Sequence, residues 1–311
     1  GQPQRKVIIS RHNAYHGSTM AGASLGGMSG MHAQGDLPIP NITHIGQPYF
    51  FENANPGETE DAFGLRAAGW LEEKILAIGP DKVAAFIAEP VQGAGGVIVP
   101  PPNYWPLVRQ ICDKYGVLLI ADEVVTGFGR SGELFGTRLW GVNADMWCLA
   151  KGISSGYIPL GATAINRRIA EVFDADTTGT ASVSHGYTYS AHPVAAAAAL
   201  ATMDEIGRLD VPGNAARVGA VLQERLRKLE HSCSFVGNVR GVGLMLGIEM
   251  VQDKALRTPM PRSSDIPARV AREAYRRGLM VRISGPNLIL SPPLVISLEE
   301  VLYLCETLEA A

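Results

Sequence analysis

The sequence predicts an α/β protein in which a large domain with a mostly parallel sheet precedes a smaller C-terminal α+β domain. Short apolar runs alternate with helical stretches up to about residue 192, as is typical of strands joined by crossover helices. Beyond that point long helices are followed by closely spaced strands. The length of 311 residues agrees with two domains, at roughly 100–200 residues per domain.

Five apolar runs are predicted to be the strands of the large domain. Each is almost continuously hydrophobic, as expected for a strand that is covered on both faces. A helix is expected over 103–115, with Asn103 as its N-cap and Gly116 at its end. The five runs are 6–10, 83–88, 117–121, 146–150 and 161–165.

The C-terminal part is predicted to form the smaller domain. Pro193 suits the first turn of an alanine-rich helix over 193–206, and the apolar spacing predicts an amphipathic helix over 218–229. We place the boundary within 205–215, around Val211-Pro212-Gly213, which gives domains of residues 1–210 and 211–311. Gly241-Val242-Gly243 is expected to be a tight turn or a bulge. The other elements expected are strands at 236–240, 244–250, 279–283 and 288–290, and helices at 266–277 and from Ser297 onward.

Composition limits the classes of function. A hydrophobic content of 46% excludes a disordered chain, and a net charge of −3 argues against a nucleic-acid or membrane-surface partner. No run reaches the ~18 apolar residues of a membrane-spanning helix, and the polar start predicts no signal peptide. The four cysteines form no CxxC pair and the histidines are dispersed, so we expect reduced thiols, a cytoplasmic protein and no metal. The charged fraction of 18% is below the typical ~25%, which indicates a large subunit interface.

Two neighbouring strands are followed by side chains suited to catalysis. The run 117–121 leads into Asp122 and Glu123, and the run 146–150 leads into Lys151. Because ligands bind beyond the carboxyl ends of strands in open α/β sheets, we expect Asp122 and Lys151 on one rim. Pyridoxal 5'-phosphate (PLP) needs a lysine that forms a Schiff base and an acidic partner for its pyridine nitrogen. Taken separately, the two carboxylates also fit helix capping or a surface pair, and the lysine also fits a solvent-facing loop.

Six short motifs strengthen the PLP interpretation. They are Tyr15-His16-Gly17, Ala88-Glu89-Pro90, the run 122–130, Ala150-Lys151-Gly152, the run 185–189 and Ser291-Pro292-Pro293-Leu294. In these motifs, in their order and in the 29-residue spacing from Asp122 to Lys151, the chain resembles the class III, or ω-type, PLP-dependent aminotransferases. It is most similar to members that pass an amine from β-alanine, polyamines or other ω-amino compounds to pyruvate. The resemblance covers nearly the whole chain and implies the type I PLP-dependent transferase fold.

The resemblance also implies a role for each matching residue. Lys151 would form the internal aldimine and move the proton between substrate and cofactor. Asp122 would bind the pyridinium nitrogen. Val124 and Tyr15 would pack on opposite faces of the cofactor ring, with His16 beside Tyr15, and would exclude water.

Three more residues complete the set that the resemblance implies. Thr188 would bind the cofactor phosphate from the neighbouring subunit, so a homodimer with shared active sites, or a tetramer, is expected. Arg282 would bind the carboxylate of the keto acid or amino acid through its guanidinium group. Glu89 matches a family glutamate near the site.

The chain departs from the family pattern in three places. Val125 replaces a Gln that contacts the cofactor's phenolic oxygen in many members, and Gly285-Pro286 replaces Gly-Asp of several polyamine-like relatives. Relatives also carry an N-terminal segment with a phosphate-binding loop, which we expect this chain to lack. The missing loop keeps open a truncated, non-catalytic chain of the same fold or a partner-binding remnant. An aminomutase or decarboxylating transaminase also stays open, because the same fold and motifs serve both, and so does an unrelated α/β domain.

Overall fold

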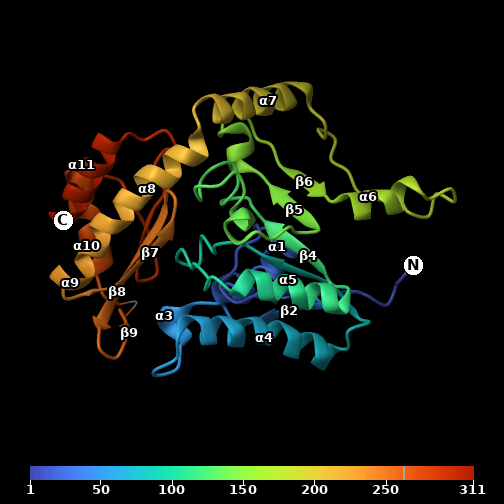
Figure 1. The fold of residues 1–311 in the computed structure, drawn as a ribbon, viewed down its shortest axis with the longest axis horizontal. Helices are drawn as coiled ribbons and strands as arrows, with labels where there is room; N and C mark the ends of the chain where they lie inside the picture. Colours follow the sequence, from blue (N-terminus) through green and yellow to red (C-terminus); the bar gives the residue numbers. More distant parts are fainter. Residues whose placement is uncertain (262) are drawn as a thin grey trace.

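Two sheets organise the fold (Figure 1). The structure is a computed structural model that describes residues 1–261 and 263–311. The first sheet has six strands in the order β2-β1-β3-β4-β5-β6, and the second has the order β10-β11-β8-β7, with β9 paired to β8. The strands of the first sheet are β1 (Val7–Arg11), β2 (Ile42–Ile45), β3 (Val83–Ala88), β4 (Leu118–Asp122), β5 (Met146–Leu149) and β6 (Ala162–Ile165).

The first sheet is parallel except at β6, which pairs antiparallel with β5. All five strands predicted for this sheet are present. The prediction missed β2, because its polar Thr43 and His44 interrupt the apolar run. The expectation that every strand is covered on both faces is wrong for β6, which is exposed at three of its four positions. It is an edge strand that pairs only with β5.

Two helices lie side by side on one face of the first sheet (Figure 1). They are α4 (Glu60–Ile78) and α5 (Tyr104–Tyr115), and their buried side chains join the sheet in the main apolar core. The predicted helix over 103–115 is confirmed as α5, and Gly116 ends it in the left-handed conformation, with φ 62°. Asn103 does not cap α5 through its side chain: its backbone is already helical (φ −85°, ψ −8°), unlike that of a typical capping residue, and its Nδ2 donates to the carbonyl oxygen of Asp61 (2.8 Å). The remaining helices of this region are α1 (Met20–Leu25), α2 (Ser29–Gly35), α3 (Phe50–Asn53) and α6 (Arg167–Asp174), with short 3-10 turns η1 (Gly136–Trp140) and η2 (Lys151–Ser154).

The second sheet is antiparallel and has its own apolar core. The prediction of a tight turn is confirmed, since Gly243 (φ 52°) lies between the paired Val242 and Met245. The predicted strand over 279–283 starts later, at Arg282. The strands are β7 (Val236–Val242), β8 (Met245–Asp253), β9 (Thr258–Pro259), β10 (Arg282–Ser284) and β11 (Asn287–Leu290). The helices are α8 (Val211–Arg227), α9 (Leu229–Ser232), α10 (Ile266–Arg276) and α11 (Leu298–Glu309).

Residues 211–213 open a helix in the structure. Asp210 caps α8, because its side chain accepts a hydrogen bond from the Gly213 amide, and Pro212 lies in the first turn. Helix α8 therefore starts earlier than the predicted 218–229. Helix α7 (Pro193–Arg208) precedes it and lies along the top of the view in Figure 1. The division into domains at residue 210 stays a prediction.

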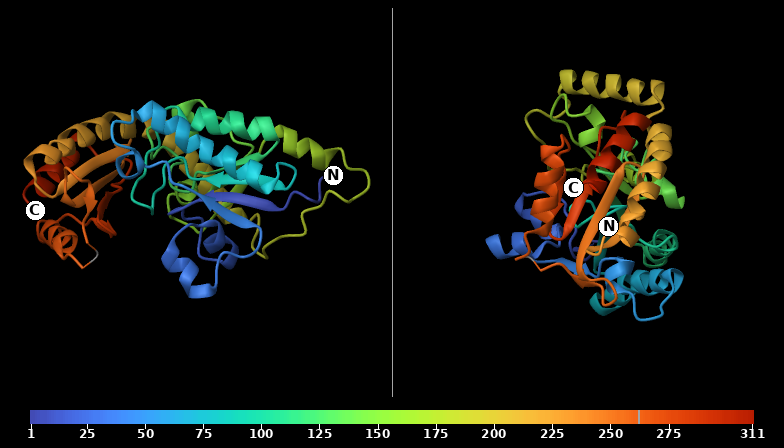
Figure 2. Two further views of the ribbon diagram at one scale, coloured as in Figure 1. Left: turned by 90° about the horizontal axis from the view of Figure 1, so that it is seen from below. Right: turned by 90° about the vertical axis from the view of Figure 1, so that its left-hand side faces the viewer.

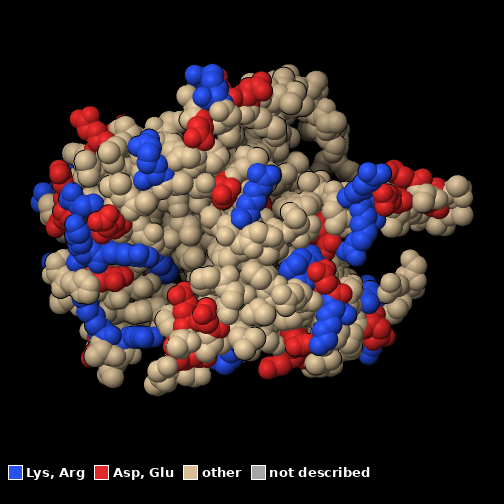
Figure 3. Space-filling view, in the orientation of Figure 1, with Lys and Arg blue, Asp and Glu red and all other residues tan. Residues whose placement is uncertain are grey.

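The segment between α6 and α7 extends away from the body of the molecule (Figures 1 and 2). Most of its residues are exposed, including Val183, Tyr187 and Tyr189. The surface in Figure 3 carries charges of both signs intermixed, and most of α7 bears none. No helix among the described residues is long and apolar enough to span a bilayer.

Candidate active site

A buried carboxylate–imidazole pair lies at the carboxyl end of β4. Asp122, the last residue of that strand, has Oδ2 2.7 Å from Nδ1 of His16, and its Oδ1 accepts a hydrogen bond from the Val124 amide (3.0 Å). The side chains of His16 and Asp122 are only 2% and 7% exposed. On the other side of the imidazole, Nε2 lies 3.3 Å from Oγ of Ser10. These contacts hold the Asp122 carboxylate in one orientation, because a buried polar group keeps its partners.

Lys151 follows the neighbouring strand at the same edge of the sheet. Strand β5 pairs in parallel with β4, with Cys148 opposite Asp122, so Lys151 comes three residues beyond that pair. It begins the turn η2 and has φ 46°, a left-handed conformation that is uncommon for a residue with a Cβ. Such strain is concentrated at functional sites, where the surrounding structure enforces it. The side chain of Lys151 is exposed.

Glu89 ties the backbone around Tyr15 to the loop after β3. Its Oε1 accepts from the Tyr15 amide (3.0 Å) and its Oε2 from the Gly93 amide (2.8 Å), while Arg11 donates to its carbonyl oxygen. Burial raises the pKa of Glu89, and Asp122 acts in the same direction, whereas His16 and the two amides oppose the shift. Glu89 therefore fixes the position of Tyr15 through the main chain.

The structure brings together only some of the predicted site residues. Hydrogen bonds connect His16, Asp122 and Val124 in one group and Tyr15 and Glu89 in another, and the sequence neighbours Tyr15 and His16 join the two groups.

Two predicted residues lie apart from these groups. Thr188 is exposed in the extended segment between α6 and α7, and Arg282 is exposed on β10 of the second sheet. Within the described ranges, no side-chain hydrogen bond joins Thr188 or Arg282 to the other predicted residues, and Lys151 likewise has none, although its strand lies next to that of Asp122.

The sequence analysis missed several residues that support the site. Ser10 and Arg11 end β1, where the position at a strand terminus was the available signal. Arg130 donates to the carbonyl oxygens of Leu244 (2.9 Å) and Pro292 (2.6 Å), so it joins two of the six motifs across the two sheets. Burial lowers the pKa of Arg130 to about 10.

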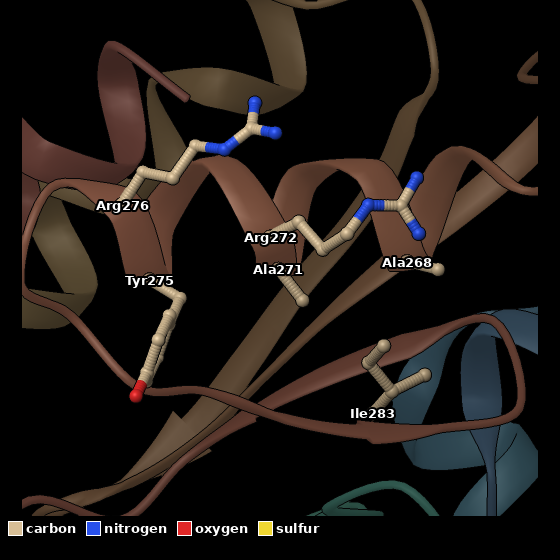
Figure 4. A pocket seen from close by; sticks show the side chains of 6 residues that line it. All are labelled: Ala268, Ala271, Arg272, Tyr275, Arg276 and Ile283. Atoms are coloured by element: carbon tan, nitrogen blue, oxygen red, sulfur yellow. The ribbon is translucent and has the colours of Figure 1, made fainter.

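A hollow in the surface lies in the C-terminal part of the chain, away from Asp122 and Lys151 in the sequence. It is a groove between α10 and β10, where Tyr275 and Ile283 face the hollow and the guanidinium groups of Arg272 and Arg276 point elsewhere (Figure 4). None of the predicted site residues lines it. In the described residues, no group of three or more His, Cys, Asp or Glu side chains could hold a metal ion.

Comparison with known proteins defines the class of this protein. Residues 1–311 match the family described as "Aminotransferase class-III", and the chain belongs to that family. The chain is 47% identical over 298 residues to a putrescine–pyruvate aminotransferase of Pseudomonas aeruginosa, covering 95% of this chain and 64% of that protein. It is 41% identical over 301 residues to a mitochondrial γ-aminobutyrate transaminase 1 of Oryza sativa subsp. indica, covering 97% of this chain and 58% of that protein.

Solved structures show the same fold. An amine transaminase from an uncultivated Pseudomonas species, solved in its PLP-bound form, superposes with a TM-score of 0.96 at 47% identity, covering 100% of this chain and 70% of that chain. The predicted α/β fold of the type I PLP-dependent transferases is thereby confirmed. The chain spans 58–65% of the length of the curated relatives it matches.

Proposed function

We propose that the chain acts in a PLP-dependent transaminase that passes an amino group from an ω-amino acid, a polyamine or a related amine to a keto acid such as pyruvate. One observation carries the proposal: the buried Asp122–His16 pair ends the strand next to the one that leads into Lys151. Membership of the class III family and the similarity to a putrescine–pyruvate aminotransferase support it.

The residues at this edge of the sheet fit the cofactor. Asp122 presents carboxylate oxygens, which suit the protonated nitrogen of a pyridine ring. Tyr15 is 37% exposed and Val124 is partly exposed, so both have surface available for contact with an aromatic ring. Lys151 offers the primary amine that PLP requires.

PLP supplies an aldehyde that takes up the amine nitrogen and a ring that accepts electrons from the substrate carbon. Lys151 would hold the cofactor and carry the proton between the reacting atoms. Asp122, oriented by His16, would keep the pyridine nitrogen protonated. Tyr15 and Val124 would exclude water from the two faces of the ring.

Two further roles depend on a second subunit and on the second sheet. We propose a homodimer, or a tetramer, in which Thr188 contacts the phosphate bound by the partner subunit. Exposed tyrosines support such an interface: Tyr187 and Tyr189, next to Thr188, are 74% and 81% exposed, and Tyr157, between η2 and β6, is 88% exposed. Arg282 would bind the substrate carboxylate. The four free cysteines agree with a reducing, cytoplasmic location.

Borohydride reduction of the protein mixed with PLP tests the assignment of Lys151. Reduction fixes the cofactor covalently on the lysine that holds it, and peptide mass spectrometry identifies that lysine. We expect the label on Lys151, and its loss together with turnover in Lys151→Ala. Lys114→Ala is the matched control, because Lys114 is an exposed lysine on α5 that pairs with Glu72. A label elsewhere, or normal turnover in Lys151→Ala, would contradict the proposal.

Substrate assays separate the alternatives within the family. Putrescine, β-alanine and γ-aminobutyrate are tested as donors with pyruvate, and alanine formation is measured. Release of CO₂ would indicate the decarboxylating relative, and transfer of nitrogen within one molecule would indicate the aminomutase. A chain that binds no PLP would support the non-catalytic alternative.

A further inference from the structure

Glu123 is a fully buried carboxylate that the proposed chemistry does not use. It follows Asp122 directly, at the end of β4, but shares no hydrogen-bond partner with it: Asp122 contacts His16 and the Val124 amide, whereas the partners of Glu123 lie on other residues. Its backbone amide donates to the carbonyl oxygen of Cys148 in β5 (3.0 Å), and its own carbonyl oxygen accepts from the Gly127 amide (2.9 Å), where the chain turns out of the sheet. Its exposed fraction is 0%.

Four donors from two separate segments surround this carboxylate. Oε2 accepts from Oγ1 of Thr126 (2.5 Å) and from the Gly136 amide (2.7 Å). Oε1 accepts from the amide (2.8 Å) and from Oγ1 (3.0 Å) of Thr137. Glu123 therefore closes the loop that leaves β4 and returns at η1.

The packing of this closed loop is tight. A Cβ added to Gly136 would lie 2.8 Å from Cβ of Thr126 and 2.9 Å from Cβ of Pro90, closer than real Cβ atoms approach one another. The loop thus has little freedom to shift while the four hydrogen bonds are in place.

The same loop supports the turn that carries Lys151. Phe128 has φ 62° and its amide donates to the carbonyl oxygen of Leu134 (2.6 Å), inside the loop that Glu123 closes. A Cβ added to Gly152 would lie 2.8 Å from Cβ of Phe128, so the residue after Lys151 rests directly on Phe128. Phe128 and Ile153 also belong to one apolar cluster.

We propose that Glu123 is a positioning residue, which holds the loop from Val124 to Phe128 and through it the turn of Lys151. The two adjacent carboxylates then have different roles. Asp122 would face the cofactor, and Glu123 fixes the backbone that positions Val124 and Lys151. The inference rests on the proposed function for its catalytic meaning, but the coupling between Glu123 and the Lys151 turn can be measured without cofactor.

Amide hydrogen exchange of the chain without PLP tests this coupling, comparing Glu123→Gln with the unaltered protein. The glutamine has nearly the same shape, but in either orientation its NH₂ group faces a backbone amide, either that of Gly136 or that of Thr137. We expect exchange to be faster by about tenfold in two peptides, 134–140 and 150–154. Lys151 should also change its rate of acetylation by acetic anhydride at least twofold, by our order-of-magnitude estimate, whereas exposed Lys114 should not.

Asp145→Asn is the matched control. Asp145 is also buried and accepts four hydrogen bonds, from the Leu119 amide and from Arg109, Asn166 and Arg168. It precedes β5, at the opposite end of that strand from Lys151. Asp145→Asn should lower the melting temperature and leave exchange in 150–154 unchanged.

Normal exchange in 150–154 and normal acetylation of Lys151 in Glu123→Gln would overturn the proposal, even if 134–140 is loosened. If Glu123→Gln does not fold, Thr137→Val removes one hydroxyl donor, keeps both backbone donors, and should give the same pattern at smaller size. Both readouts are made without PLP. Failure to bind PLP would therefore count against the proposed function and not against this coupling.

Discussion

Arg240→Met should destabilise the protein, because Arg240 is a buried cation whose hydrogen bonds connect the second sheet to the loop after β3. Arg240 of β7 donates from Nη1 to Glu249 (2.8 Å), from Nη2 to the carbonyl oxygen of Gly96 (2.6 Å) and from Nε to that of Val97 (3.0 Å). Its guanidinium also lies 4.4 Å from the centre of the Tyr49 ring. Arg240 and Glu249 are 7% and 6% exposed, so Arg240→Met leaves a buried carboxylate without its cation.

Removing one partner of a buried ion pair costs about 3–5 kcal/mol of unfolding free energy. We expect Arg240→Met to lose about that amount in urea denaturation. Arg240→Lys keeps the charge, but its single ammonium cannot reach the same set of acceptors, so a smaller loss is expected. The double variant Arg240→Met with Glu249→Leu should recover much of the loss, because no unpaired charge then stays buried.

A loss below about 1 kcal/mol in Arg240→Met would refute this argument, since that is the size of an exposed pair. The argument would also be refuted if the double variant lost as much unfolding free energy as the two single variants together, because the residues would then act independently.

The hydrogen bonds of Arg240 also have a functional consequence. Arg240 also donates to Oδ1 of Asn287 on β11, and β11 pairs with β10, the strand that carries Arg282. In a catalytically active enzyme, Arg240→Lys should therefore raise KM for the keto acid more than it lowers kcat.

Two further predictions concern stability. Burial lowers the pKa of His44, and burial together with the nearby Lys74 lowers the pKa of His12. Both histidines are therefore harder to protonate in the folded state than in the unfolded state. The free energy of unfolding should be highest above the unfolded pKa near 6.5 and should decrease as the pH drops below it. Melting temperatures from pH 8 to 5 should decline less in His44→Gln, and an unchanged slope would contradict the assignment. Gly219→Ala should destabilise the protein, because the added Cβ would lie 2.1 Å from the Gly243 carbonyl oxygen. Gly69→Ala, in open space within α4, should instead stabilise it by up to about 1 kcal/mol, and equal effects of the two changes would contradict this reasoning.

Local sequence patterns were sufficient for most of the central strands. The runs that became β3 and β4 are apolar and mostly buried, so their burial is visible in the sequence itself. The run that became β5 is equally apolar, but all four of its residues are only partly buried. Helix α4 was missed although it is one of the main supports of the sheet. Its buried positions include Gly64 and two alanines and are interspersed with several charged residues, so the apolar face is weak in the sequence. That face becomes part of a core only where it packs with α5 and the sheet.

The sequence by itself determined that Asp122 and Lys151 lie at one edge of a parallel sheet, because both directly follow apolar strands and parallel strands end at the same edge. Only the tertiary structure decided which partners these residues have. His16 reaches Asp122 from 106 positions away, and no local spacing encodes that contact. The same holds for Glu123: its sequence neighbour is Asp122, but the packing of η1 against the loop after β4 makes it a support for the backbone.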